Sequence, residues 1–305
     1  MAFYTTSDNT GKNKGAVVLI EKALSRAVWW LACPHHFYAL HVKKAARFYF
    51  GDSSCPEETI YKKLKDDWNN IIDKEIDYDD LELFDWQRWD GTFLADRAAQ
   101  VLVNLISLLE NNTFPREDLK ELLNLVVVWL GGKVQKLSFQ YPGAMSHARF
   151  LIQSIYSVKI YLLSRQLDNF PEEELEQIKN VALFVGLFHA PWYFRSPLAI
   201  SAPMLHLSTI SQMKKLQKIL PDLAKVILDS ISLHLWYLTP QSIPLALTDE
   251  TLSADQRSWI ATGLNSITRL DVIPIGKPSF PDLSTWPDEL WAADSLPDFS
   301  TMLGP

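Results

Sequence analysis

Three groups of residues in this sequence are of types that bind metal ions or phosphate. A polar loop at residues 5–11 carries one acid, Asp8, and a Cys-x-x-His spacing follows at Cys33 and His36. The third group consists of two short basic clusters, which are Lys43, Lys44 and Arg47, and Lys62, Lys63 and Lys65.

Asp8 lies in a loop rich in Ser, Thr and Asn. A carboxylate there is a ligand type for Mg²⁺, which proteins hold with one or two carboxylates plus substrate phosphates. Phosphoryl transfer with two such ions needs at least two further acids at the same point, and the sequence does not place them. The alternative interpretation is that Asp8 is the N-cap of a helix.

Cys33 and His36 have the spacing of a metal-ligand pair. A structural zinc site normally needs a second close pair, which is missing here, although His35, His41 and Cys55 are near in sequence. A cysteine nucleophile is disfavoured, because Pro34 adjoins Cys33 and the sequence has no glycine loop to stabilise an oxyanion. The simpler interpretation is a buried cysteine beside a histidine that is bonded within the fold.

The two basic clusters are candidate contacts to DNA phosphates. Asp66, Asp67 and the acidic stretch at residues 73–85 offset much of their positive field. The net charge of −7 gives the chain no global attraction to nucleic acid. The alternative is that these lysines form a solvated helix face.

The spacing of apolar residues predicts the elements that position these groups. A helix over 14–27, a strand over 28–32 and a helix from residue 35 form a small α/β element at residues 1–50. Residues 51–268 predict a large helical domain, with a buried helix at 94–109, a glycine cap at Gly131 and Gly132 and a capping box at residues 253–256. We expect Pro191 to end the helix that begins near Pro171. Residues 269–305 are predicted to be a Pro-rich extended tail.

The composition limits the class of protein. In 305 residues, 48% are hydrophobic and 21% are charged, which is typical of a globular chain that is long enough for a sizeable core. Only 11 glycines argue against a glycine-rich phosphate loop. Two cysteines, the absence of a signal-peptide pattern and short apolar runs predict a soluble intracellular protein without a membrane partner. The fold class we predict is mainly α.

The order of these parts resembles the core of hAT-type transposases. In that family an acidic T-D-x-x-S-N-like loop precedes a helix, a strand and a C-x-x-H motif, and a large helical domain is then inserted into an RNase H-like fold. The resemblance is closer to a group of transposon-derived proteins of invertebrates, and the matching segments are residues 5–11, residues 32–36 and residues 51–57. It covers about the first sixty residues.

The resemblance implies a partial RNase H-like element, a nuclear location and an origin in a DDE-type enzyme that used Mg²⁺. The family's first catalytic acid lies upstream of the loop, so we expect a core truncated at its N-terminus. Tyr4 stands where the related proteins lead us to expect an acid, and Glu250 and Glu289 match no pattern for the third acid. Asp8 is then a remnant of the site.

We therefore expect a transposon-derived protein without catalytic activity and without a cofactor, which keeps a helical surface for a protein partner, self-association or weak contact to DNA. One alternative is an active metal-dependent transposase or nuclease that is completed by missing segments. The other is a helical scaffold that is unrelated to nucleic acid.

Overall fold

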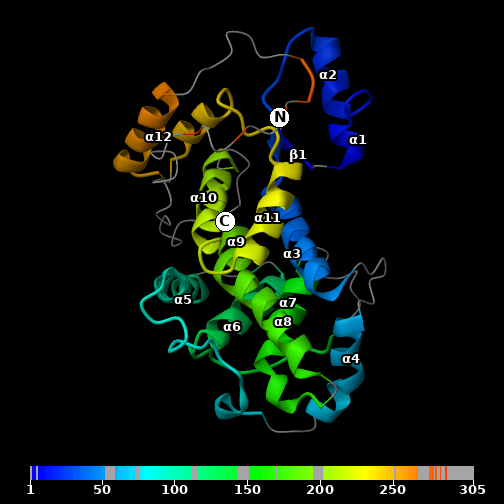
Figure 1. Ribbon diagram of the computed structural model, residues 1–305. Helices are drawn as coiled ribbons and strands as arrows, with labels where there is room; N and C mark the ends of the chain where they lie inside the picture. Colours follow the sequence, from blue (N-terminus) through cyan, green and yellow to red (C-terminus); the bar gives the residue numbers. More distant parts are fainter. Residues whose placement is uncertain are drawn as a thin grey trace. The chain divides into compact units, whose positions relative to one another are not determined.

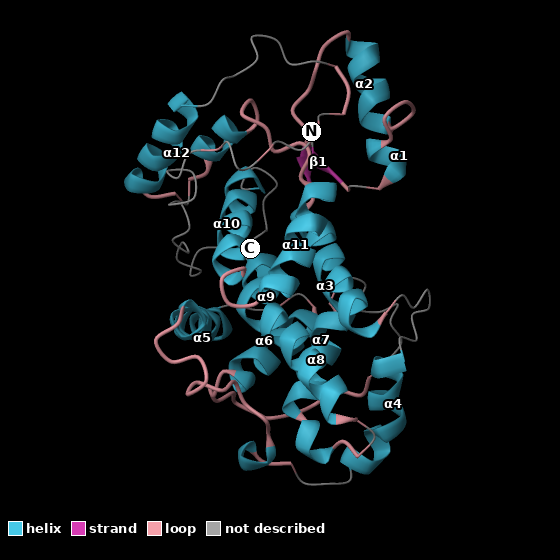
Figure 2. Cartoon of the chain, in the orientation of Figure 1, coloured by secondary structure: helices cyan, strands magenta, loops and turns pink. Residues whose placement is uncertain are grey.

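The chain is mainly α-helical (Figure 2). The computed structural model describes residues 2–4, 6–51, 59–72, 76–111, 114, 116–142, 151–168, 170–194, 202–250, 252–266, 275–277, 279, 282 and 286. These residues contain twelve α-helices and two strands of two residues each. The helical class predicted from the sequence is confirmed, while most of the tail predicted at 269–305 lies outside the described residues.

The chain forms two compact units, whose elements are labelled in Figure 1. Unit 1 combines Met1–His41 with Arg195–Pro297. Unit 2 is formed by Val42–Phe194 together with Asp298–Pro305. Unit 1 is therefore built from two parts of the sequence that are far apart. The division predicted at residues 50 and 268 stays a prediction.

Unit 1 begins with two short strands that pair in parallel. Strand β1 (Ala2–Phe3) lies beside β2 (Leu31–Ala32), with Ala2 opposite Leu31 and Phe3 opposite Ala32. The chain between them forms α1 (Ser7–Thr10) and α2 (Ala16–Leu24), and α3 (Pro34–Phe50) follows β2.

The strand predicted at 28–32 is shorter in the structure. Strand β2 contains only Leu31 and Ala32, and the N–H of Val28, which precedes it, donates to the carboxylate of Glu21 at 3.0 Å. Trp30 is buried and its ring lies edge-on to that of Phe3, with 5.5 Å between the centroids. Only the last two residues of the predicted run therefore pair with β1.

The second part of unit 1 is helical. Its elements are α10 (Ala202–Leu216), α11 (Pro221–His234), a 3₁₀-helix η5 (Ile243–Thr248) and α12 (Ala254–Ser266). Helix α10 packs against α11, and α12 packs against η5. The predicted capping box is confirmed, because the Ser253 hydroxyl accepts from the Gln256 N–H and the Gln256 side chain accepts from the Ser253 N–H.

Unit 2 is a helical assembly with α6, α7 and α8 at its centre. Its elements are α4 (Thr59–Ile72), α5 (Phe93–Asn111), α6 (Glu117–Trp129), α7 (Ile152–Leu162), α8 (Glu172–Phe184), the π-helix η3 (Val185–His189), α9 (Ala190–Phe194) and the 3₁₀-helices η1 (Tyr78–Asp80) and η2 (Ser164–Gln166). The pairs α6–α7 and α7–α8 make the main contacts. Gly131 follows α6 with a φ of +87°, as the predicted glycine cap requires.

The acidic stretch that precedes α5, of which residues 76–85 are described, forms an acidic connection that covers the carboxyl ends of two helices. The Glu82 N–H donates to the Leu162 carbonyl at the end of α7 at 2.9 Å, and the Phe84 N–H donates to the Trp129 carbonyl at the end of α6 at 2.8 Å. The last carbonyls of a helix have no partner within the helix. The connection therefore supplies N–H groups that these two helix ends need.

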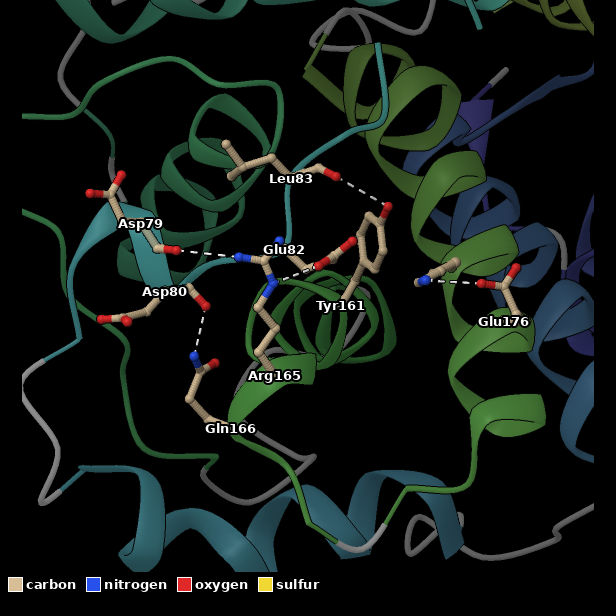
Figure 3. A network of polar contacts seen from close by, with 9 residues as sticks. Asp79, Asp80, Glu82, Leu83, Tyr161, Arg165, Gln166 and Glu176 are labelled. Carbon is tan, nitrogen blue, oxygen red and sulfur yellow. Dashed lines mark hydrogen bonds and ion pairs between the residues drawn. The ribbon is translucent and has the colours of Figure 1, made fainter. Parts of the chain in front are cut away.

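Side chains from η2 and α7 hold the same connection in place (Figure 3). Arg165 donates to the Glu82 carboxylate at 2.8 Å and to the Asp79 carbonyl at 3.3 Å. Gln166 donates to the Asp80 carbonyl at 2.7 Å, and the Tyr161 hydroxyl donates to the Leu83 carbonyl at 3.2 Å. These bonds fix residues 79–83 against the end of α7.

The prediction that Pro191 ends a helix is wrong. The backbone stays helical from α8 through η3 and α9 as far as Phe194. Proline has no N–H to donate to the carbonyl four residues earlier, which is that of Leu187. The buried side chain of Arg97 on α5 donates its Nε–H to this carbonyl at 2.8 Å. A guanidinium from another helix thus replaces the missing backbone donor.

We predict that Arg97→Met lowers the free energy of unfolding by about 1–3 kcal/mol, because the Leu187 carbonyl stays buried without this donor. In a Pro191→Ala background the cost should be smaller, since residue 191 then has an N–H to offer. Urea unfolding of the two single variants and the double variant measures the coupling.

The matched control is Val103→Ala, at a position on α5 that is 67% exposed. We expect it to change the free energy of unfolding by less than about 0.5 kcal/mol. If Arg97→Met lowered the free energy of unfolding equally in the wild type and in Pro191→Ala, Arg97 would not be acting in place of the missing N–H of residue 191.

Candidate functional site

The polar loop and the Cys-x-x-His motif meet at the strand pair of unit 1. The Cys33 N–H donates to the Phe3 carbonyl at 2.8 Å, which continues the ladder beyond β2. His36, in the first turn of α3, lies edge-on to the ring of Tyr4 with 5.8 Å between the centroids. The Asn9 amide donates to the Tyr4 carbonyl at 2.9 Å. The two motifs therefore form one local structure.

Asp8 lies in the first turn of α1 and its side chain is exposed. The N-cap position is occupied by Thr6, so the interpretation of Asp8 as an N-cap is wrong. Across the described ranges, no group of three or more His, Cys, Asp or Glu side chains is placed to hold a metal ion. Cys33 is half-buried and its thiol is free, and Cys55 lies outside the described residues.

Behind the Cys-x-x-His motif lies a buried cluster of aromatic and histidine side chains. His206 Nδ1 is hydrogen-bonded to the Tyr237 hydroxyl, and His41 Nδ1 lies 2.9 Å from the Ser230 hydroxyl. The Phe37 ring lies 4.2 Å from the His206 ring and 5.2 Å from the His41 ring, between centroids. The cluster joins α3 to α10 and α11.

Burial controls the protonation of this cluster. Loss of solvent lowers the pKa of His206 well below its ordinary value, and the nearby His41 lowers it further. Burial raises the pKa of the Tyr237 hydroxyl well above its ordinary value, and Tyr38 and Cys33 add to the effect. A neutral imidazole and a neutral phenol make a stable hydrogen bond in an apolar setting. Because both side chains are at most 1% exposed, the cluster positions helices and offers no surface to a ligand.

The basic residues predicted to contact DNA lie on α3 and α4, within unit 2. Lys43 and Lys44 on α3 are exposed and Arg47 is half-buried. The end of α3 meets the start of α4 at Phe50 and Tyr61, whose ring centroids are 6.5 Å apart.

On α4, Lys62 and Lys65 are exposed. Lys63 is half-buried, forms an ion pair with Glu174 of α8 and lies over the Phe170 ring at 5.5 Å. The structure thus leaves four of the six predicted basic residues exposed. Lys63 is engaged within the fold.

Glu21 was not predicted to be important, yet its buried carboxylate accepts three hydrogen bonds from separate segments of unit 1. It is 1% exposed. It accepts from the N–H of Val28 and the indole N–H of Trp30, both at 3.0 Å, and from the N–H of Gly276 at 2.8 Å. Its position beside Val17 and Val18 on the apolar face of α2 was the available signal, because a buried acid must find donors.

Unit 2 holds a second group of charged residues around a cavity of about 630 Å³. The wall includes three lysines and three glutamates, which are Lys120, Lys133, Lys136, Glu110, Glu117 and Glu121. Glu121 pairs with the buried Lys159 of α7 at 2.5 Å, and Lys159 also donates to the Gln140 carbonyl at 2.7 Å. Burial lowers the pKa of Lys159, which the carboxylate of Glu121 partly offsets. With balanced charges, the wall favours neither an anion nor a cation.

No protein-family model, no curated protein and no solved structure matches this chain. Among the helices in the described ranges, none combines the length and the hydropathy that a bilayer crossing requires.

We predict that the unit 1 cluster makes stability depend on pH below neutrality. Because the pKa of His206 is lowered in the folded chain, the unfolded chain takes up the proton first as the pH falls through about 6.5. The free energy of unfolding should then fall by up to about 1.4 kcal/mol per pH unit for this one site. Urea unfolding at pH 8, 6 and 5 measures it.

In His206→Gln the loss of unfolding free energy that is linked to protonation of this site should disappear. The free energy of unfolding should therefore differ less between pH 8 and pH 5 in the variant than in the wild type. At pH 8, where imidazole is neutral in both states, the variant reports only the change in packing. An identical pH dependence in both proteins would contradict the assignment.

We predict that Glu21→Gln lowers the free energy of unfolding by about 1–3 kcal/mol, since an amide NH₂ then faces a backbone or indole N–H donor. Chemical denaturation measures the change, with the neighbouring exposed Lys22→Gln as the matched control. A variant as stable as the wild type would show that the carboxylate does not hold these segments together.

Proposed function

We propose that this chain derives from a hAT-type transposase core, lacks transposase activity and retains its helices as a surface for weak contact to DNA or to a protein partner. One observation carries the proposal. The polar loop and the Cys-x-x-His motif, which are two of the segments that resemble the family, are linked through Tyr4: its carbonyl accepts from Asn9 of the loop, and its ring packs against His36. The β1–β2 pair and the bond from the Cys33 N–H to the Phe3 carbonyl lie beside this link. The parallel pair with helices between and after the strands fits a partial RNase H-like element.

The proposed loss of activity rests on the residues at the loop. Tyr4 stands where the resemblance implies an acid, and its side chain packs edge-on against His36. Asp8 is exposed on a helix of four residues. Transfer of a phosphoryl group with metal ions needs several carboxylates that converge on one point. A single exposed acid on so short a helix fits a remnant of such a site.

The surface proposed for DNA is the exposed part of the two basic clusters. Lys43, Lys44, Lys62 and Lys65 offer solvated ammonium groups, which bind phosphate as point charges. The acids Asp66, Glu172 and Glu173 are also exposed in unit 2 and weaken the field. Binding of this kind is independent of base sequence and sensitive to salt.

We predict that Lys43→Gln/Lys44→Gln weakens binding to duplex DNA at low ionic strength. The slope of log K against log salt should become shallower by about 2, since each lost phosphate contact changes it by about 0.9. Fluorescence anisotropy with labelled duplexes at several salt concentrations measures both effects. Lys63→Gln is the matched control, because the Lys63 ammonium is already paired with Glu174 and should leave the slope unchanged.

One outcome would overturn the proposed contact to DNA, and another would overturn the proposed loss of activity. Absence of salt-sensitive binding would favour a helical scaffold that is unrelated to nucleic acid. Strand cleavage that requires Mg²⁺ or Mn²⁺ and disappears in Asp8→Ala would show an active nuclease instead.

A further inference from the structure

One large apolar side chain is exposed within the basic cluster of α3. Phe48 is 48% exposed, and it follows Lys43, Lys44 and Arg47 on the same helix. At 3.6 residues per turn, these side chains lie within an arc of about 140°. Residues 42–51 hold three basic and no acidic side chains, although the whole chain has a net charge of −7. This part of α3, which we call the aromatic–basic face, is therefore locally positive and carries an exposed ring.

The Phe48 ring stands at the end of a row of aromatic side chains in unit 2. It lies edge-on to the Tyr49 ring with 4.9 Å between the centroids. The Tyr49 and Phe50 centroids are 6.4 Å apart, and the Phe50 and Tyr61 centroids are 6.5 Å apart. Tyr61 on α4 is 2% exposed. An aromatic side chain has only two rotatable bonds, so a ring that is packed in this way loses little freedom when a ligand binds to it.

The charged neighbours of Phe48 distinguish it from an ordinary exposed apolar residue. Single apolar side chains are common on protein surfaces and need no ligand. Val103 on α5 is such a case, since it is 67% exposed and its neighbours four residues away are Ala99 and Ser107. Phe48 has Lys44 four residues before it, and the Cβ atoms at this spacing are about 5–6 Å apart on a helix. A ligand that uses both side chains must carry a flat aromatic group beside a negative charge.

A nucleotide in a single strand has these two properties. In a duplex the faces of the bases are covered by neighbouring bases, whereas unpaired bases stack on aromatic side chains. Proteins that bind single strands without sequence preference combine positive charge with such rings, and each stacked base contributes roughly 5- to 150-fold to the affinity. The exposed ammonium groups of Lys43 and Lys44 can bind the phosphates as point charges.

We infer that the aromatic–basic face binds single-stranded DNA, with an unpaired base stacked on the Phe48 ring and the adjacent phosphates at Lys43 and Lys44. The half-buried Arg47 adds positive charge to the same face. This inference rests on the proposed contact to DNA and specifies its ligand. The lysines contact the phosphates of any strand, while the ring contacts only an unpaired base. Bases as well as phosphates should therefore contribute to the affinity.

Fluorescence anisotropy of the full chain with labelled strands tests the stacking. One strand has twelve thymidine nucleotides, and the other has twelve abasic sites with the same phosphates. The wild type should bind the thymidine strand about tenfold more tightly, within the range for one stacked base. In Phe48→Leu this advantage should disappear, while the slope of log K against log salt stays the same because no charge is lost. Phe48→Trp keeps a ring and should bind the thymidine strand at least as tightly as the wild type.

Two further variants separate the ring from the charges. Lys43→Gln/Lys44→Gln should weaken the binding of both strands and make the slope shallower by about 1.4, since each phosphate contact of a single strand contributes about 0.7. The matched control is Val103→Ala, which shortens an exposed apolar side chain on α5 and should change neither affinity. Because Phe48 is about half exposed, thermal unfolding of its variants should match that of the wild type, which confirms that the fold is intact.

The possible failures are distinguishable. Equal affinity of the wild type and Phe48→Leu for the thymidine strand, with the effect of the lysines retained, would overturn the stacking and leave the proposed contact to DNA in place. A wild type that bound the thymidine and abasic strands equally would do the same. Absence of salt-sensitive binding to either strand would overturn the proposed contact to DNA itself. Tighter binding of a uridine strand than of the thymidine strand would overturn the assignment to DNA in favour of RNA.

Discussion

The buried carboxylate of Glu21 links the two separate parts from which unit 1 is made. A carboxylate that is removed from water is costly unless several donors replace the solvent. Here the donors come from the turn after α2, from the segment before β2 and from the distant residue Gly276. The arrangement holds only if all these segments are in place, so the order of the N-terminal elements and the return of residue 276 depend on one another. Trp30 adds a second link between the two parts, since its ring also packs edge-on against that of Trp236 with 5.0 Å between the centroids.

In unit 2 the buried groups that need hydrogen-bond donors include backbone carbonyls. Helix ends and a proline inside a helix leave carbonyls without a partner, and such groups are rarely left unpaired when buried. In this unit they are satisfied by segments that are remote in sequence. Arg97 serves the Leu187 carbonyl, and the N–H groups of Glu82 and Phe84 serve the ends of α7 and α6. The helices are therefore held by directional bonds as well as by apolar packing.

Local patterns in the sequence predicted the local structure well. The helical class, the glycine cap at Gly131 and the capping box at Ser253 and Gln256 depend on neighbouring residues, and the structure confirms all three. One of the predictions that failed depends on a distant partner, and two failed within a few residues. Arg97, ninety-four positions before Pro191, supplies the donor that proline lacks, and the helix continues. The N-cap of α1 is Thr6 in place of Asp8, and the strand predicted at 28–32 is limited to Leu31 and Ala32.

The candidate site, too, could be predicted from neighbouring residues but not from contacts between distant ones. The sequence indicated that Cys33 and His36 matter, but the spacing alone could not tell a ligand pair from a structural pair. The contacts to Phe3 and Tyr4 depend on the pairing of β1 with β2, across about thirty residues. The burial of His206 against Tyr237 was likewise out of reach, because single histidines in helices give no signal of their surroundings.

The acidic connection at the ends of α6 and α7 has a consequence for how unit 2 opens. Helices usually fray from their ends independently, because each last turn is held only by its own bonds. Here one stretch of backbone closes both ends, and Arg165 and Gln166 fasten that stretch to the turn that follows α7. Release of residues 79–84 uncovers both helices at once. The final turns of α6 and α7 thus share a single local transition.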